Sequence, residues 1–337
     1  MANDDLSMSR RGVVGVAAGA GVIAAVTAQP ATAQAPTAAP AAAASAPRPD
    51  PRSRFPKPPF TEQTQPFPGL AGRMNPRPDH GETSYRGSGR LAGRKALITG
   101  GDSGMGRAAA IAYAREGADV AISFLPDEEP DAREVIDLIK REGRVAVALP
   151  GDIRDEAHCR QMVATAVQQL GGLDIVVNNA SRQQQRQNLE EITSEDFDAT
   201  MKTNVYAMFW ITKAAVPHMQ PGASIINTTS VQAYNPSEDL LDYASTKAAL
   251  NNLVVNLASE LGSRGIRVNA VAPGPIWTPL IPSTMPEERV SGFGADTPLG
   301  RAGHPVEVAA AYVFLASDEA SYVSGTVLGV TGGKPVF

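Results

Sequence analysis

The chain has 337 residues, 43% of them hydrophobic, and a formal net charge of −5 at pH 7. This length is enough for a sizeable core, and a chain without a basic surplus is a poor match for nucleic acid as a partner. A single cysteine, Cys159, excludes an internal disulfide, and no cluster of metal-ligating residues is predicted.

Residues 1–35 combine a basic pair, an apolar stretch and small-residue steps. Arg10 and Arg11 precede the apolar residues 13–28, and Ala-x-Ala steps follow at 31–35. This order is typical of a secretory signal, and the Arg pair resembles a twin-arginine export signal. We therefore predict a twin-arginine signal peptide, a periplasmic or secreted protein, and no stable membrane span after cleavage. An uncleaved anchor, an Ala-rich leader without a role in export, and a cytoplasmic location stay open.

Residues 36–90 are predicted to be an Ala/Pro-rich linker that continues into an extended arm. The tract "PATAQAPTAAPAAAASAPRPDP" cannot bury a core. Residues 52–90 stay proline-rich but add apolar side chains. This segment can lie over its own domain, lie over a neighbouring subunit, or be disordered. The added apolar residues are Phe55, Phe60, Phe67, Leu70, Met74 and Tyr85.

From residue 91 to 337, short β-branched segments alternate with Ala-rich amphipathic segments. This alternation predicts an α/β fold with a parallel sheet, helices on both faces, and ligands beyond the carboxyl ends of the strands. Strands are predicted over 95–100, 118–124, 144–152, 173–180, 223–230, 266–274 and 326–333. Helices are predicted over 106–117, 131–143, 155–170, 194–219, 242–263 and 305–316.

The first predicted strand runs into a glycine-rich turn, "TGGDSGMGR", and then into a helix. Gly100, Gly104 and Gly106 let the turn tighten and let backbone amides approach a pyrophosphate at the helix N-terminus. At this junction the pattern predicts dinucleotide binding, and the alternative is a tight loop without a ligand. The intervening residues Asp102, Ser103 and Met105 are candidate cofactor contacts as well.

Two further strand ends are expected to contact the same dinucleotide. Asp152 and Ile153 follow the third strand, where the carboxylate can accept from an adenine amino group. The alternative role of Asp152 is to cap the next helix. Asn179 and Ala180 end the fourth strand, where backbone lies near the ribose.

The end of the second predicted strand indicates whether the cofactor carries a 2′-phosphate. The sequence "AISFLPDEEPD" has no cation before Arg133, and carboxylates disfavour a phosphate dianion. No Asp stands at the strand tip, where a ribose diol is commonly bound. The interpretation favours NAD and leaves NADP open.

Tyr243 and Lys247, in "DYASTKAAL", are four residues apart on a predicted helix, so they lie on one face. An ammonium near a phenol favours the phenolate, and we expect Lys247 to bring the pKa of Tyr243 closer to working pH. Ser230 ends a strand that meets the same sheet edge, where its hydroxyl can hydrogen-bond a substrate oxygen.

These motifs, in this order, resemble the short-chain dehydrogenase/reductase family over residues 91–333. The matching stretches are "TGGDSGMG", "NNA", Ser230, "YASTK" and "PGPIWT". The resemblance implies a single Rossmann-type doubly wound sheet and an NAD(P)-dependent oxidoreductase that interconverts an alcohol and a carbonyl. The "NNA" is followed by Ser181 where the family usually has Gly. The glutamine-rich run that comes next, "RQQQRQ", and the stretch "SFLPDEEPD" look most like the bacterial general-stress or glucose/ribitol-type subgroup.

The resemblance also implies roles for individual residues. Tyr243 would be the general acid/base, Lys247 would hold the nicotinamide ribose, and Ser230 would orient the reacting oxygen. Asn204 would hold a water of the proton relay. The residues implied to contact the nicotinamide end are Pro273, Gly274, Ile276 and Thr278.

Substrate and assembly are predicted from loops and helix faces. Residues 275–300, with Trp277 and Phe293, are expected to cover the substrate. A hydroxylated or small carbonyl compound is expected because polar residues are predicted to face the cleft. These are Gln184, Gln185, Gln232 and Tyr234. A homotetramer is predicted from the apolar residues of helix 242–263. These are Leu250, Leu253, Val254 and Leu257.

Two other functions stay open. One is a redox sensor or scaffold that binds the cofactor without significant turnover. The other is a lyase or epimerase on the same fold.

Overall fold

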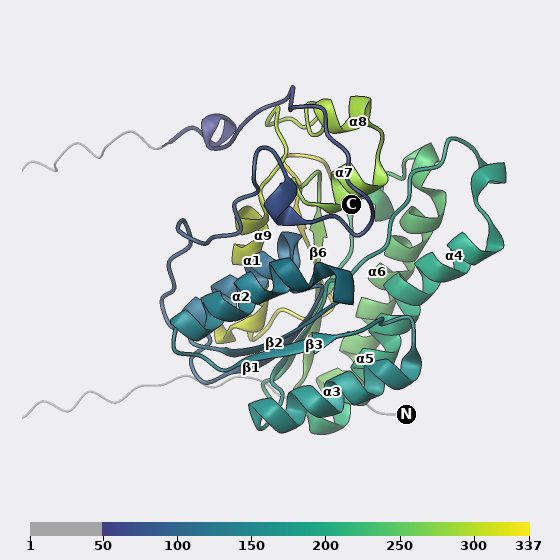
Figure 1. Ribbon diagram of the computed structural model, residues 1–337. Helices are drawn as coiled ribbons and strands as arrows, with labels where there is room; N and C mark the ends of the chain where they lie inside the picture. Colours follow the sequence, from purple (N-terminus) through teal and green to yellow (C-terminus); the bar gives the residue numbers. More distant parts are fainter. Residues whose placement is uncertain (1–48) are drawn as a thin grey trace, which may run out of the picture. The chain divides into compact units, whose positions relative to one another are not determined.

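The computed structural model describes residues 49–337, so the predicted signal peptide and the start of the linker lie outside the described residues. Within the described part, seven strands form one parallel sheet in the order β3-β2-β1-β4-β5-β6-β7 (Figure 1). The strands are β1 (Lys95–Thr99), β2 (Asp119–Phe124), β3 (Ala146–Pro150), β4 (Ile175–Asn178), β5 (Ser224–Thr228), β6 (Arg267–Pro273) and β7 (Val327–Val330).

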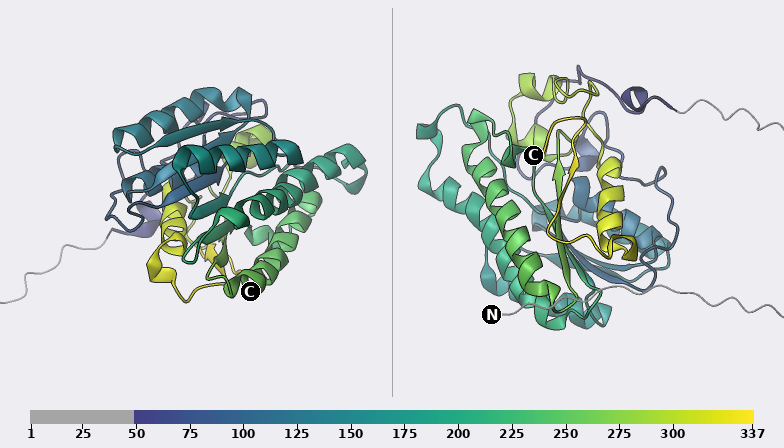
Figure 2. Two further views of the ribbon diagram at one scale, coloured as in Figure 1. Left: turned by 90° about the horizontal axis from the view of Figure 1, so that it is seen from below. Right: turned by 180° about the vertical axis from the view of Figure 1, so that it is seen from behind.

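Helices cover both faces of this sheet, and the predicted doubly wound fold is confirmed (Figures 1 and 2). No helix between residues 49 and 337 is both long and apolar enough to span a membrane. One face carries α1 (Gly104–Arg115), α2 (Glu129–Arg141) and α9 (Pro305–Ala316). The other carries α3 (Glu156–Leu170), α4 (Ser194–Met201), α5 (Ala207–Ala215) and α6 (Leu241–Gly262). Two short helices, α7 (Leu280–Thr284) and α8 (Glu287–Ser291), lie within the segment expected to cover the substrate.

The strands form because consecutive residues are apolar, as a sheet buried on both faces requires. Leu97 and Val176 are register partners on β1 and β4, and both belong to the core under α3 and α5. The next pair, Ile98 and Val177, belongs to the core under α1 and α9. The parallel register brings the carboxyl ends of the central strands to one edge of the sheet, where the cavity described below lies.

The helix predicted over 194–219 is interrupted by a wider turn. A π-helical turn, Lys202–Tyr206, separates α4 from α5, and a 3₁₀ turn, Val216–His218, follows α5. Such single π turns are often found at functional sites. This one contains Asn204, whose side chain is buried.

Residues 49–90 pack against the domain of their own chain, which is one of the three arrangements left open by the sequence. We call this segment the arm. Its Phe60 is buried and stacks on Trp277, with ring centroids 4.1 Å apart. The backbone amide of Phe60 donates to the carbonyl of Ser291 at 2.8 Å. The purple part of the arm lies beside α7 and α8 in Figure 1.

The apolar residues of α6 that suggested a subunit interface are partly used inside the protomer. Leu250 and Val254 are buried, and Val254 packs in the core beneath the sheet. The expectation that they form an outer face is wrong for these two residues, because α6 turns them toward its own sheet. The exposed apolar residues of this helix are Leu241 and Val255.

Candidate active site

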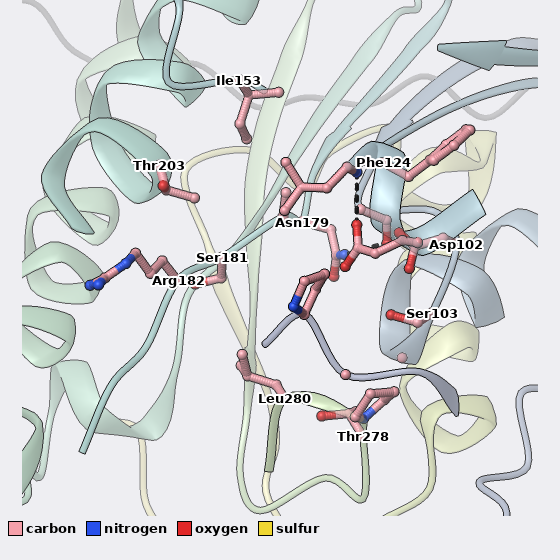
Figure 3. A pocket seen from close by; sticks show the side chains of 18 of the residues that line it. Asp102, Ser103, Phe124, Ile153, Asn179, Ser181, Arg182, Thr203, Thr278 and Leu280 are labelled. Carbon is pink, nitrogen blue, oxygen red and sulfur yellow. Dashed lines mark hydrogen bonds between the residues drawn. The ribbon is translucent and has the colours of Figure 1, made fainter. Parts of the chain in front are cut away.

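A cavity lies at the carboxyl ends of the strands, as a parallel α/β sheet predicts. Figure 3 shows Arg182 and Thr203 on one side of it and Asp102, Ser103 and Phe124 on the other. Thr278 and Leu280 close a third side. The cavity is lined by the glycine turn, by the residues that end β2, β3 and β4, by α6, and by part of the arm.

The glycine turn has the shape that a dinucleotide-binding loop requires. Gly100 has φ +62°, a left-handed conformation that favours glycine. A Cβ on Gly106 would lie 2.0 Å from the carbonyl oxygen of Gly100, so α1 can begin this close to β1 only with glycine here. The side-chain amide of Asn179 donates to the carbonyls of Thr99 and Gly100, at 3.1 and 3.2 Å, and holds the turn to β4. The turn therefore presents its backbone amides, at the start of α1, to a diphosphate.

Most of the predicted cofactor residues line this cavity, and four do not. Gly106 serves the packing of α1. A Cβ on Gly274 would lie 2.6 Å from the carbonyl oxygen of Thr331. The glycine therefore allows the end of β6 to lie close to the backbone that follows β7. Pro273 and Ile276 are buried behind the cavity wall. The predicted residues that line the cavity are Gly100, Asp102, Ser103, Gly104, Met105, Asp152, Ile153, Asn179, Ala180, Tyr243, Lys247 and Thr278.

Asp152 is half-exposed and forms an ion pair with Arg154, at 2.6 Å. Burial would raise its pKa, but hydrogen bonds from Arg154 lower it. The alternative role as helix cap is wrong, because Asp155 caps α3 and accepts the amide of Ala157 at 2.8 Å. Asp152 is thus an ionised acceptor at the cavity wall.

Tyr243 and Lys247 lie together on the buried face of α6. Their side chains are 8% and 1% exposed, and the Lys247 Nζ lies 5.2 Å from the centroid of the tyrosine ring. The ammonium donates to the carbonyl of Thr228, at the end of β5, at 2.9 Å. Ser230, two residues further on, lies near enough to the Tyr243 phenol to influence its pKa, but does not itself line the cavity. The structure therefore brings the three residues to one place.

Burial sets the pKa values of this group. It raises the pKa of Tyr243 to about 12, and the nearby Ser230 hydroxyl opposes this only in part. It lowers the pKa of Lys247 to about 7. The expectation that Lys247 lowers the phenol's pKa is therefore wrong for this structure, because desolvation disfavours the charged form of both groups. At neutral pH the phenol is protonated and is a proton donor.

Asn204 connects the end of β4 to α6. Its Oδ1 accepts from the backbone amide of Arg182 at 2.7 Å and from the hydroxyl of Ser181 at 3.1 Å. Its Nδ2 donates to the Arg182 carbonyl at 2.9 Å and to the Thr246 hydroxyl at 3.0 Å. All the hydrogen-bonding groups of this amide are used, so the side chain fixes the loop after β4 against the helix that carries Tyr243.

A buried carboxyl group, Asp102, and a partly buried one, Glu128, lie near the end of β2. Asp102 is 1% exposed, and its Oδ2 has no hydrogen-bond partner within the described residues. Glu128 accepts the amide of Leu125 at 2.8 Å and lines the same cavity. Burial raises the pKa of both groups, and each charge is disfavoured further by neighbouring carboxylates. A protonated Asp102 could donate into the cavity, which fits a hydroxyl-bearing ligand such as a ribose diol.

The polar residues expected to face the substrate do not line the cavity. The Gln185 amide hydrogen-bonds Asp239, and the Gln232 amide is bound to Ser237. Tyr234 lies near Asn251, away from the cavity lining. Partners within the chain take up these side chains, which spacing along the sequence cannot show. Trp277, expected near the substrate, is instead buried beneath Phe60 of the arm.

Other residues line the cavity that were not predicted as site residues. Ser181 and Arg182 follow β4, and Arg182 forms an ion pair with Asp196 at 2.6 Å. Phe67, Pro68 and Gly69 belong to the arm. The polar run after "NNA" was a signal for Arg182, whereas no periodic pattern marks the arm residues.

The family model described as "Enoyl-(Acyl carrier protein) reductase" matches residues 100–334. The chain belongs to the short-chain dehydrogenase/reductase family. It is 56% identical to the uncharacterized oxidoreductase YhxD of Bacillus subtilis over 280 residues, which are 82% of this chain and 94% of that protein. It is 49% identical to general stress protein 39 of the same species, over 84% of this chain and 98% of that one. It is 42% identical to the glucose and ribitol dehydrogenase of Daucus carota, over 83% and 97%.

A solved short-chain dehydrogenase of Burkholderia cenocepacia, in complex with NADP, has the same fold with a TM-score of 0.69. It is 36% identical and is matched over 73% of this chain and 99% of its own. The resemblance inferred from the motifs, including its subgroup, is thus confirmed. As a short-chain dehydrogenase/reductase, the protein is an oxidoreductase with a nicotinamide dinucleotide as cofactor, and the glycine turn and the Asp102 carboxyl fit that group.

Proposed function

We propose that this short-chain dehydrogenase/reductase interconverts an alcohol and a carbonyl, with Tyr243 as the general acid/base. The observation that carries the proposal is that Tyr243 and Lys247 line the same cavity as the glycine turn, with Ser230 near the phenol. A proton donor and a dinucleotide-binding loop thus share one space, with a second hydroxyl beside it, which is what a carbonyl reduction needs.

The protein's own residues supply orientation and a proton. When bound, the nicotinamide supplies or accepts hydride. The Ser230 hydroxyl hydrogen-bonds the substrate oxygen, and Tyr243 donates its proton to the same oxygen as negative charge develops there. Lys247, on the same face of α6, would hold the nicotinamide ribose, as the family resemblance implies. In the oxidation direction the phenolate accepts the proton from the alcohol.

The proposed route for proton return passes Asn204. A second cavity of about 10 Å³ is lined by Asn204, Thr228 and Lys247. This is close to the minimum that holds one water, and its wall combines these polar residues with apolar ones such as Ile211 and Leu250. A water here would connect the Lys247 ammonium to the loop that Asn204 holds.

Replacing Tyr243 by Phe tests the acid/base role. The side chain keeps its packing but loses the hydroxyl, so we expect kcat to fall by about 10³-fold, in the range general acid catalysis contributes. The dissociation constant of the cofactor, measured by fluorescence titration, should stay within about twofold. Full turnover in the variant would contradict the proposal. Cofactor binding by the unaltered protein without turnover of any alcohol or aldehyde would instead favour a sensor or scaffold.

We further propose NAD as the preferred cofactor. Asp102 and Glu128 place carboxyl groups near the end of β2, where a protonated Asp102 suits a ribose diol and an ionised carboxylate disfavours a phosphate dianion. The two arginines that line the cavity, Arg154 and Arg182, already pair with aspartates. The Burkholderia relative was solved with NADP, so the choice needs a direct test. Titration of both dinucleotides should show tighter binding of NAD, and tighter binding of NADP would contradict this.

For the substrate we propose a hydroxylated or small carbonyl compound. Ser181, Arg182 and Thr203 give the cavity a polar wall. Two relatives carry names that fit, a glucose and ribitol dehydrogenase of Daucus carota and a homologue in Oryza sativa. A panel of polyols, sugars, short aldehydes and steroids, followed by nicotinamide absorbance, checks this. Turnover of steroids alone would reject it.

We propose export by the twin-arginine route and assembly into a homotetramer. Export of the folded protein would let it carry its cofactor from the cytoplasm. A reporter fused to residues 1–40 should leave the cytoplasm, and retention there would contradict export. The exposed Leu241 and Val255 of α6 suit contact with a second copy. Sedimentation that finds only a species of about 35 kDa would contradict the tetramer.

A further inference from the structure

The arm contributes three residues to the wall of the cofactor cavity. Phe67, Pro68 and Gly69 line it together with the glycine turn and Tyr243, although they precede the catalytic domain in sequence. A segment that only covered the outside of the domain would not reach this space. We call residues 65–72 the strap.

The strap is shaped by its own first residue. The Oε1 of Gln65 accepts the amide of Leu70 at 2.8 Å, and its Nε2 donates to the Leu70 carbonyl at 3.2 Å. The chain between them is therefore a closed loop whose shape is set before any ligand binds. Pro68, at its centre, removes further backbone freedom.

One side of the strap is bound to the segment around α7. The backbone amide of Gln65 donates to the carbonyl of Pro282 at 2.8 Å. A Cβ on Gly69 would lie 2.7 Å from the carbonyl oxygen of Pro279, so the two chains come this close only with glycine at this position. Thr278, Pro279 and Leu280 line the cavity themselves.

The other side of the strap is bound to the start of α2. The carboxylate of Asp131, in the first turn of that helix, accepts the amide of Ala71 at 2.6 Å and the amide of Gly72 at 3.4 Å. Asp131 is 3% exposed. The helix follows β2 closely, and Leu125 and Glu128 between them line the cavity. The strap thus joins the two flanks of the cavity.

Phe67 has no place in the core of the domain. Its side chain is 50% exposed, whereas Phe60, seven residues earlier, is 6% exposed and stacks on Trp277. A half-exposed aromatic ring at the edge of a cavity is available for contact with a bound molecule.

We propose that the strap is part of the cofactor site, and that Phe67 contacts the bound dinucleotide and slows its dissociation. The inference rests on the proposed function, because it takes the cavity to be the dinucleotide site. Release of the ligand then requires it to pass a loop held on both sides. An exported oxidoreductase would gain from this, since little free cofactor is present outside the cytoplasm.

Replacing Phe67 by Ala in the full chain tests the role of the strap. We expect the dissociation rate of the reduced cofactor, measured by stopped-flow fluorescence, to rise about tenfold, with an equal rise in the dissociation constant. The melting temperature without cofactor should stay within about 1 °C, because the ring is half-exposed and surface substitutions have small effects.

Phe55→Ala is the matched control, because Phe55 is also a phenylalanine of the arm but does not line the cavity. Its ring stacks on that of His304, with ring centroids 4.2 Å apart. Its cofactor dissociation rate should equal that of the unaltered protein. An unchanged rate in Phe67→Ala, or an equal increase in Phe55→Ala, overturns the role of the strap while leaving the proposed function intact. Absence of dinucleotide binding by the unaltered protein overturns both.

Discussion

The arm and the catalytic domain reach their positions by different means. In the domain, each strand and helix is specified by a local apolar period, and the core forms where these elements stack. The arm has only short 3₁₀ turns, Pro51–Ser53 and Ala71–Arg73, and no strand within its described residues 49–90. It is held by individual contacts such as the stacking of Phe60 on Trp277. A segment without regular structure can therefore be as firmly placed as a helix when its few side chains find partners.

The two regions also treat buried charge differently. Glu116, the residue that caps the C-terminus of α1, faces the arm, and its side chain is completely buried. Burial alone would raise its pKa, but hydrogen bonds from Tyr85 and Arg90 outweigh this and lower the pKa to about 2. Lys247 has one carbonyl partner, and burial lowers its pKa to about 7. The arm supplies hydrogen-bond partners that stabilise the buried charge of Glu116. The catalytic centre supplies Lys247 with a single carbonyl partner, so burial still disfavours its charged form.

The largest effect is expected from adding one methyl group to the glycine turn. In Gly106→Ala the new Cβ would lie 2.0 Å from a backbone carbonyl, so β1 and α1 must separate. We expect cofactor affinity to fall by about 100-fold or more, by analogy with overpacking of a rigid core. The same change in the strap, Gly69→Ala, meets a carbonyl at 2.7 Å. Calorimetric titration should show that Gly69→Ala lowers cofactor affinity by only about threefold. Equal losses of affinity in the two variants would show that the strap and the glycine turn do not differ in this respect.

A second test asks how much the arm stabilises the domain. Phe60→Ala removes the ring that covers Trp277, so the free energy of unfolding should fall by about 3 kcal/mol, as for other buried phenylalanines. Urea denaturation followed by tryptophan fluorescence measures it. Phe67→Ala is the companion variant and should cost about 0.5 kcal/mol or less. If both variants lose the same stability, the arm is not anchored at Phe60 as described.

The smallest effect concerns pH. Lys247 has a folded pKa of about 7, below its value of 10.5 in an unfolded chain, so between these values the unfolded state binds more protons. Stability from this group therefore rises with pH over this window. Lys247→Met removes the dependence. The free energy of unfolding of the variant minus that of the unaltered protein should decrease as pH rises from 7.5 to 9.5, by at most about 1.4 kcal/mol per pH unit. A difference independent of pH would show that the ammonium stays charged in the folded protein.

The sequence by itself determined the sheet, its helices and the residues at the strand ends. Apolar runs such as those of β1 and β4 are typical of strands buried on both faces of a parallel sheet, and the order of elements then brings the glycine turn, Ser230 and Tyr243 to one edge. These are consequences of local pattern and chain topology, which is why they could be predicted from one chain.

Only the tertiary structure decided which side chains face the cavity. Gln185 is directed to Asp239, which is 54 residues away, and Leu250 packs inward, whereas Gln232 is bound by Ser237 within its own loop. The pKa of Tyr243 depends on burial, which the spacing of four residues does not report. Phe67 reaches the cavity through anchors at Pro282 and Asp131. Long-range contacts of this kind have no period along the chain, so they become visible only when the chain is folded.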